Sequence, residues 1–496
     1  MRELPESAIS RPSEIIIPVR GAAELVRGLG LWSATAILIG NVIGSAIFLV
    51  GSEVARDAGS APLSLAAWVA GGALSLCGAL SLAELGAAIP RAGGLYAYLT
   101  RGLSPAWGFL YGWTSSTVVE TTGAAAIAAG FLLLIRFLVP AAGAPLFYFH
   151  IHGFFQVKTY YFAFTAAQPL AAGVIVVVTG INYLSVRSGG HIQLLATMLK
   201  VCAVAALVVI GLVSRTGNFT NLWMGSTPLA AGTTSAFLAA LVPVMWAYSG
   251  WHMLGPVGEE VENPGKDIPR ALIGGMLAVT VLYVMVNWVY LRVLGFAGVA
   301  QSGHVASDVF EIIVGGGGAK WLTIAMMISA LGCLHVSILA AARIPFAMAR
   351  DGIFFKFAQR VQPTSGSPSG GLLFVGGIAA LMALSGTYEE LYSLVTFALT
   401  IFLALSMVAL IRLRRIEPAL PRPYFAWGYP WTSILFLIGS LAMTANLWLE
   451  HPIRSSIGLC IILLGLPLYF HWRKEVQCEG AHVVGQDRYT GGEAPG

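Results

Sequence analysis

Residues 40–48 read GNVIGSAIF, and residues 247–251 read AYSGW. Each stretch lies near the middle of a long apolar segment, at the depth of a bilayer centre. Glycine weakens a helix interior, so each helix is predicted to be interrupted there. Unwound backbone in a membrane survives only where it is buried in protein or lines a cavity. Two interrupted spans at matching positions therefore predict a transporter with its site between the breaks.

The composition around these stretches is that of a membrane protein. Of the 496 residues, 57% are hydrophobic and 10% are charged, whereas soluble domains carry about 25% charged residues. About 20 apolar residues cross a bilayer as one helix. The fold class predicted is an all-α membrane protein with twelve transmembrane helices, at 28–52, 58–83, 103–138, 159–186, 190–214, 234–258, 271–291, 321–342, 361–388, 391–411, 423–449 and 455–472.

The two interrupted spans are the first and the sixth, so they are five helices apart. This spacing predicts a 5+5 arrangement of two inverted repeats, with two extra helices after them. The C-terminal tail is polar and rich in glycine, which predicts disorder from about residue 473. The predicted parts are a cytoplasmic N-terminal tail, a transport core of two repeats, helices 11 and 12, and a cytoplasmic C-terminal tail: 1–29, 30–412 (30–214 and 234–412), 413–472 and 473–496.

The basic residues predict the orientation of the chain. With the N-terminus in the cytoplasm, most of the 28 Lys and Arg residues fall in tails and loops on that side. The positive-inside rule then places both termini in the cytoplasm and the protein in the cell (inner) membrane. The net charge of +5 follows from this topology and requires no nucleic-acid partner.

The predicted breaks supply the two kinds of group that a zwitterion needs. An unwound stretch leaves free amides at the start of the following half-helix and free carbonyls at the end of the preceding one. The amides of residues 44–46 are predicted to bind a carboxylate, and carbonyls near Val42, Trp246 and Ser249 an ammonium group. The whole predicted substrate site comprises Val42, Ile43, Gly44, Ser45, Ala46, Trp246, Ala247, Ser249, Trp251 and His252.

The first break also has a purely structural interpretation, namely helix packing. Gly40 and Gly44 are four residues apart, a spacing that also favours close packing between helices. The second break, however, has the bulky amphipathic side chains of Trp251 and His252 beside it, which close packing does not favour. The two breaks together therefore favour a binding site.

Charged residues lie inside two of the predicted spans. Glu120 is midway along the third span and Lys200 is well inside the fifth. Each charge costs about 2.5 to 3.5 kcal/mol at the bilayer centre, so each is a functional candidate. We predict that Glu120 and Lys200 face each other and form a coupling site; the alternative is an ion pair that only locks two helices together.

A further group of charged residues forms either an inner gate or solvated helix caps: Glu84, Arg91, Glu259, Glu260, Glu262, Lys266, Asp267 and Arg270.

Four stretches resemble one known superfamily. They are IGNVIGSAIF (39–48), LSLAELGAAIPRAGGLYAYL (80–99), AYSGWHMLGPVGEEVENPGKDIPRAL (247–272) and AAARIPFAMARDGIF (340–354). The chain resembles the amino acid-polyamine-organocation superfamily, and within it the L-type and bacterial amino acid permease branches. The resemblance implies a LeuT-like inverted-repeat fold, alternating access, and an amino acid held at the two breaks.

The resemblance also gives roles to single residues. Ala46 replaces the last glycine of the usual Gly-Ser-Gly, which narrows the carboxylate pocket while leaving the amide free. Trp246 stands where L-type members carry an aromatic gate, and Ser249 stands where others have glycine or an acid, which argues against a dedicated cationic substrate. Lys200 looks like the helix 5 lysine of sodium-independent relatives, so no sodium requirement is expected.

The predicted function is sodium-independent secondary active transport of amino acids, by exchange or by proton symport. A carrier of polyamines or other organic cations is the alternative. A membrane-embedded enzyme is a remote one, because the sequence has neither a Gly-rich phosphate loop nor a His-Glu-x-x-His motif. The five cysteines have no paired spacing, so no metal, cofactor or disulfide framework is predicted. The partners predicted are an amino acid substrate, the lipid bilayer and, for symport, protons, with no accessory subunit.

Overall fold

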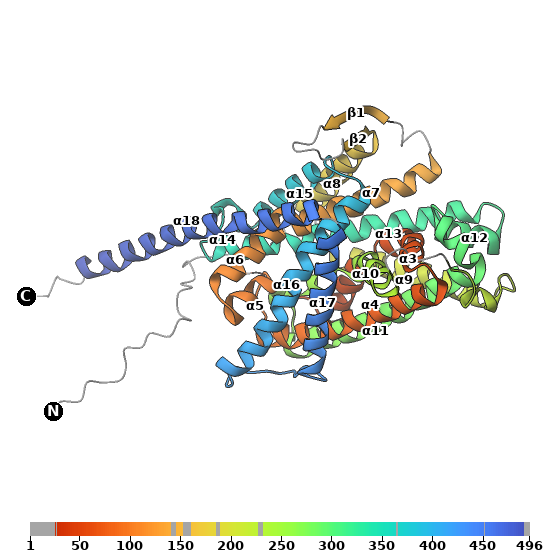
Figure 1. The fold of residues 1–496 in the computed structure, drawn as a ribbon. Coiled ribbons are helices and arrows are strands. Elements are labelled where there is room, and N and C mark those ends of the chain that lie inside the picture. The colour runs from red at the N-terminus through yellow and green to blue at the C-terminus, as the bar shows by residue number, and fades with distance from the viewer. Residues whose placement is uncertain are drawn as a thin grey trace, which may run out of the picture.

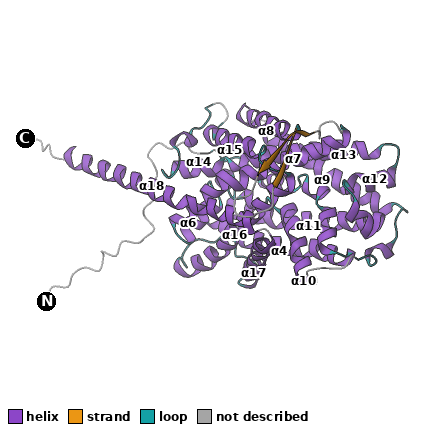
Figure 2. Cartoon of the chain, turned by 45° about the horizontal axis from the view of Figure 1, so that its top comes forward, coloured by secondary structure: helices purple, strands orange, loops and turns teal. Residues whose placement is uncertain are grey.

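The structure is a computed structural model that describes residues 25, 27–139, 145–151, 160–184, 189–226, 232–363, 366–450 and 452–490. This part of the chain is almost entirely helical (Figures 1 and 2). Its α-helices are α1 (Leu31–Val42), α2 (Ala46–Leu49), α3 (Gly51–Ala58), α4 (Ala61–Ala88), α5 (Leu95–Gly102), α6 (Pro105–Thr114), α7 (Glu120–Leu138), α8 (Ala167–Leu184), α9 (Gly189–Val213), α10 (Thr233–Tyr248), α11 (Pro264–Gln301), α12 (Val305–Val314), α13 (Gly318–Ala341), α14 (Arg343–Arg350), α15 (Ser369–Met382), α16 (Tyr388–Ile416), α17 (Trp431–Glu450) and α18 (Pro452–Thr490). The other elements are the π-helix η1 (Ser115–Val119), the 3-10 helices η3 (Phe219–Leu222), η4 (Trp251–Leu254), η5 (Gly258–Glu260) and η6 (Lys356–Gln359), and the strands β1 (Pro145–Ile151) and β2 (Tyr160–Thr165).

The described residues include ten helical segments that are long and apolar enough to cross a membrane. Two shorter apolar helices, Thr197–Val213 and Ser369–Met382, lie where the fifth and ninth spans are predicted. Each predicted span therefore overlaps at least one described helix. The prediction of an all-helical membrane protein is confirmed.

Both predicted interruptions are present. In the first span α1 ends at Val42 and α2 begins at Ala46, and in the sixth α10 ends at Tyr248 and η4 begins at Trp251. Gly250 follows the end of α10 with φ +116°, a backbone conformation that glycine adopts without the steric cost that a side chain brings. The local sequence thus explains where the sixth span unwinds.

The third span contains a different irregularity. The π-helix η1 joins α6 to α7 and ends directly before Glu120. A π-turn closes hydrogen bonds to the fifth rather than the fourth residue, and such turns occur often at functional sites. One extra residue in a turn rotates the following helix by about 100° relative to a regular α-helix.

An aromatic cluster holds the first half of the sixth span in place. Trp68 on α4, Tyr248 on α10 and Tyr283 on α11 are buried against one another, with ring centroids 5.1 to 6.0 Å apart. The Tyr248 hydroxyl also donates to the Trp68 carbonyl at 3.1 Å. α10 is therefore anchored to α4 and α11 up to the residue where it ends.

Two boundary predictions are wrong. The fourth span was predicted from residue 159, but residues 160–165 form β2, which pairs antiparallel with β1, and α8 begins only at Ala167. Aromatic residues and threonine in YYFAFT favour a strand. The tail predicted to be disordered from 473 instead continues α18 to Thr490, away from the other helices (Figure 1). A helix that is already formed extends without a second nucleation cost.

Candidate functional site

A small cavity of about 50 Å³ lies between the two breaks. Its walls come from α1 and α2, from η1 and α7, from α10 and η4, and from α13 and α16. The predicted site residues that line it are Val42, Gly44, Ser45, Ala46, Trp246, Ser249 and His252, together with Glu120. The cavity lining does not include Ile43, Ala247, Trp251 or Lys200.

Several lining residues were not predicted from the sequence. They are Asn41, Val119, Gly123, Ala124, Ile127, Gly250, Met253, Cys333, Ser337, Val395 and Leu399. Most are small or apolar residues inside apolar spans, so nothing in their own chemistry marks them. Asn41, Gly250 and Met253 belong to the broken spans themselves, whereas the packing of η1, α7, α13 and α16 around the breaks brings the others to the cavity.

The first break offers two free amides. In the part of the chain that the structure describes, the amides of Ser45 and Ala46 have no hydrogen-bond acceptor. The Gly44 amide is not available, because it donates to the Val42 carbonyl at 2.9 Å. The amides of Ser45 and Ala46 are thus available as donors, whereas the amide of Gly44 closes the turn.

The backbone carbonyls at the two breaks have hydrogen-bond partners that differ from the prediction. The Val42 carbonyl accepts hydrogen bonds from the Gly44 amide and from the Tyr283 hydroxyl, both at 2.9 Å, which occupies both of its lone pairs. The predicted ammonium contact at Val42 is therefore wrong. The Trp246 carbonyl accepts from the Ser249 amide at 3.0 Å. The carbonyls of Ala247 and Ser249, at the end of α10, accept no hydrogen bond from any described residue.

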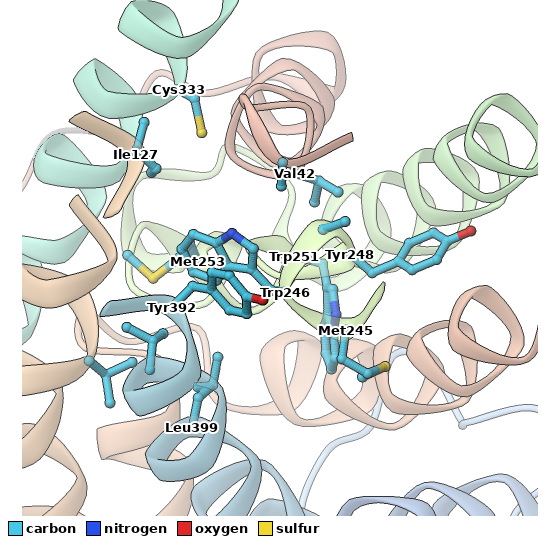
Figure 3. Packing of buried hydrophobic residues seen from close by; sticks show 14 of the residues in the cluster. Val42, Ile127, Met245, Trp246, Tyr248, Trp251, Met253, Cys333, Tyr392 and Leu399 are labelled. Carbon is cyan, nitrogen blue, oxygen red and sulfur yellow. The ribbon is translucent and has the colours of Figure 1, made fainter. Parts of the chain in front are cut away.

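Trp246 forms part of a buried aromatic cover over the cavity. Its indole N–H donates to the Tyr388 hydroxyl at 2.9 Å, and its ring stacks on Tyr392 with centroids 5.7 Å apart (Figure 3). The Tyr392 hydroxyl donates in turn to the carboxylate of Glu53 on α3. Burial raises the pKa of Glu53 to about 7, against the smaller lowering effect of the hydrogen bond from Tyr392. The cover thus joins the sixth span to α16 and α3.

Trp246→Ala is expected to lower the initial rate of amino acid uptake about tenfold or more, because it removes buried apolar area and the bond to Tyr388. Trp246→Phe keeps a ring and is expected to retain more activity. Uptake into proteoliposomes measures both variants, with Trp321→Ala as the matched control, because Trp321 is 74% exposed. Unchanged rates and substrate range in Trp246→Ala would show that Trp246 only packs.

Lys200 binds the first broken helix and not Glu120. Its ammonium group, 2% exposed, donates to the Gly40 carbonyl at 2.8 Å, and Thr197 one turn earlier donates to the Ala36 carbonyl at 3.1 Å. α9 therefore holds the last turns of α1 before the break. Glu120 has its own partners on the other side of the cavity.

Glu120 is paired with the second break. Its Oε1 lies 3.3 Å from Nε2 of His252 and 3.5 Å from the hydroxyl of Ser115. The predicted Glu120–Lys200 pair is therefore wrong. The physical reason is the π-turn directly before Glu120, which changes the direction in which the third span presents this side chain.

Ion pairs fix the segment that follows the sixth span. Glu259 binds Arg350 through two hydrogen bonds of 2.8 Å, and Glu260 binds Arg343 at 2.7 Å. Burial alone would raise the pKa of Glu259, but the hydrogen bonds from Arg350 and from the amide of Ala92 outweigh it, so this pKa is lowered. The contacts join the exit of the sixth span to α14, which favours an inner gate over solvated caps for these glutamates.

Two other members of the predicted gate group also form ion pairs, one close to these contacts and one elsewhere. Arg91 pairs with Asp351 at 3.2 Å and so adds to the same contacts. Glu84 is fully buried and pairs with Arg414 and Arg422, which ties α4 to the end of α16 and the segment after it. Glu84 thus stabilises the helix packing at some distance from the sixth span.

The sequence matches one protein family over nearly its whole length. The model of the amino acid permease family covers residues 29–466. The chain belongs to the amino acid permease family. The resemblance noted in the sequence is thereby confirmed, and this permease is a multi-pass membrane transporter of amino acids and not an enzyme.

Curated relatives of this permease are named transporters. It is 29% identical over 460 residues to the serine/threonine exchanger SteT of Bacillus subtilis, covering 91% of this chain and 98% of the relative. It is 30% identical over 473 residues to the large neutral amino acids transporter small subunit 2 of Homo sapiens, covering 92% and 83%. It is 28% identical over 459 residues to the human cystine/glutamate transporter, covering 91% and 86%.

Proposed function

We propose that this permease is a sodium-independent exchanger of small neutral amino acids in the cytoplasmic membrane. The observation that carries the proposal is one cavity with free amides at Ser45 and Ala46 and free carbonyls at Ala247 and Ser249 beside it. A zwitterion supplies the carboxylate and the ammonium group that these free backbone groups lack. One relative is named a serine/threonine exchanger, which supports exchange of small neutral amino acids, and another is named a transporter of large neutral amino acids, which supports a neutral substrate.

The two breaks present opposite partial charges to the substrate. The amides of Ser45 and Ala46 stand at the start of α2, which continues through a helical Val50 into α3, so the positive end of this half-helix faces a carboxylate. The carbonyls of Ala247 and Ser249 stand at the negative end of α10. A polyamine has no carboxylate and would leave the two amides unpaired, which disfavours the alternative reading.

The cavity also limits the substrate. The cavity is small, about 50 Å³, which favours a substrate with a short side chain. Residue 249 is a serine and not an acid, and Glu120 already has His252 as a partner. Among its described lining residues, the cavity therefore offers no unpartnered carboxylate group to bind a cationic side chain. Both features favour small neutral amino acids.

The mechanism that we propose is alternating access between two inverted five-helix repeats, 30–214 and 234–412, in a protein of twelve crossings with both termini in the cytoplasm. Support comes from the matching breaks five spans apart and from the helices at all twelve predicted positions. The cytoplasmic ion pairs of Glu259 and Glu260 are proposed to break when the cavity opens inward. The aromatic cover of Trp246 is proposed to open outward.

Lys200 favours exchange over ion-coupled uptake. Its ammonium group on the Gly40 carbonyl supplies a positive charge that belongs to the protein itself, next to the first break, so that no coupling cation is needed there. Proton symport is the second candidate, because Glu120 is an acid at the cavity. In liposomes with an imposed pH gradient and no internal amino acid, exchange predicts no accumulation until internal amino acid is supplied. Accumulation that is lost in Glu120→Gln would favour symport instead.

The zwitterion model predicts a strong requirement for the substrate carboxylate. Serinamide and ethanolamine are expected to compete with serine uptake roughly tenfold to a hundredfold more weakly than serine does, because each leaves the amides of Ser45 and Ala46 without a charged acceptor. Competition assays in proteoliposomes measure this. Equal competition by serine and ethanolamine would refute amino acid recognition at the breaks and support the organic-cation alternative.

A further inference from the structure

We propose that Glu120 and His252 form a side-chain subsite that selects amino acids with a short, hydroxyl-bearing side chain, as in serine and threonine. This inference rests on the proposed function, because it assumes that the substrate head group is held at the two breaks. It concerns side chains of the cavity and not its free backbone groups, and a different part of the substrate.

The cavity divides into a head-group region and a side-chain region. The backbone groups of the breaks lie on the side of α1, α2 and α10, whereas η1, α7 and α16 supply mainly apolar residues: Val119, Ala124, Ile127, Val395 and Leu399. Glu120 is the one acid and His252 the one histidine among the described lining residues. A substrate side chain directed toward η1, α7 and α16 therefore meets apolar walls and this polar pair.

The pair has unused hydrogen-bonding capacity. Oε1 of Glu120 is taken by His252 and Ser115, while the second carboxylate oxygen has no partner among the described residues. Nδ1 of His252 is likewise buried without a partner in the described part of the chain. A carboxylate oxygen at a cavity accepts a hydrogen bond from a hydroxyl donor, which stabilises both groups away from water.

The local backbone directs Glu120 to this position. η1 places the Ser115 hydroxyl five residues before Glu120 on the same face, so that Ser115 and His252 together fix one oxygen of the carboxylate. The other oxygen is left for the ligand. Fixed partners on one oxygen and none on the other are the arrangement expected of a recognition group and not of a helix-locking ion pair.

A hydroxyl fits this subsite better than other donors. His252 already occupies one oxygen of the Glu120 carboxylate, so a cationic substrate group would have to share this carboxylate with it. The small cavity, about 50 Å³, disfavours long amine or guanidinium side chains. A site that binds a substrate hydroxyl discriminates strongly against the analogue that lacks it, because the polar group of the protein is then left unpaired.

The experiment compares threonine with its near-isostere valine, and serine with alanine, as competitors and as labelled substrates in proteoliposomes. Wild-type protein is expected to prefer the hydroxylated member of each pair more than tenfold. Glu120→Leu is expected to bring both ratios close to one, with Glu450→Leu, an exposed glutamate at the end of α17, as the matched control that keeps them. His252→Asn is the second variant, and it too is expected to lower the ratios.

The outcomes separate this inference from the proposed function. Equal transport of threonine and valine by the wild type would overturn the inference and leave amino acid transport intact. An unchanged threonine preference in Glu120→Leu would overturn the role of Glu120. No transport of any of the four amino acids would overturn the proposed function itself. Should Glu120→Leu not fold, the wild-type ratios and the His252→Asn ratios still decide.

Discussion

Replacing Lys200 by methionine is expected to reduce amino acid uptake to background. The ammonium group of Lys200 donates to the Gly40 carbonyl from a position that is almost fully buried. Methionine keeps an unbranched apolar stem but leaves that carbonyl without its donor, at a cost of about 1 to 3 kcal/mol. α1 would then lose its link to α9 just before the break that binds the substrate. Uptake into proteoliposomes and thermal unfolding of the purified variant measure the two consequences.

Lys320→Met is the matched control for this variant, because Lys320 is exposed at the start of α13. It is expected to transport at the wild-type rate. Wild-type uptake by Lys200→Met would mean that the charge is dispensable for the cycle. A variant that unfolds before reconstitution would instead show that Lys200 is needed for the folded state, and Lys200→Arg would then test the charge alone.

Gly250→Ala is expected to abolish transport and to lower the unfolding temperature. Gly250 has φ +116°, and a Cβ atom there would lie 2.8 Å from the carbonyl carbon and 2.9 Å from the carbonyl oxygen of Asn41. Both contacts are with backbone, so the two breaks would have to separate. The strained conformation adds about 1 to 3 kcal/mol. Substrate-induced thermal stabilisation should disappear together with uptake.

Gly274→Ala is the control for the glycine variant. Gly274 lies within α11, and a Cβ atom there would meet nothing within 4 Å. Alanine is the better helix former by about 1 kcal/mol, so this variant should transport normally and be at least as stable as the wild type. Normal uptake by Gly250→Ala would show that the two breaks do not need to touch.

The sequence predicts the breaks well because their cause is local. Glycines at 44 and 250 interrupt apolar runs that otherwise form helices, and the structure unwinds each span within a few residues of them. The positions of Glu120 and Lys200 were also visible, since any charge in an apolar run stands out. These features depend on residue type and on position along the chain.

The partners of these groups could not be predicted, because they depend on helix rotation and on contacts between distant spans. The π-turn changes the direction in which the third span presents its side chains just before Glu120, and nothing in the sequence SSTVV predicts such a turn. The Val42 carbonyl is taken by Tyr283, which is more than 200 residues away and carries no motif. A free carbonyl therefore cannot be told from an occupied one until α11 is packed against α1.

The contact between Lys200 and Gly40 has a consequence for how the membrane voltage acts on this permease. The voltage does work, about 2.3 kcal/mol per elementary charge at 100 mV, only on charge that crosses the bilayer. A sodium ion would cross with the substrate, whereas the lysine ammonium stays in the protein and returns to its starting place in every cycle. In the proposed exchange one zwitterion replaces another, so no net charge moves. The direction of transport then follows from the amino acid gradients alone, and an electrical potential of either sign leaves it unchanged.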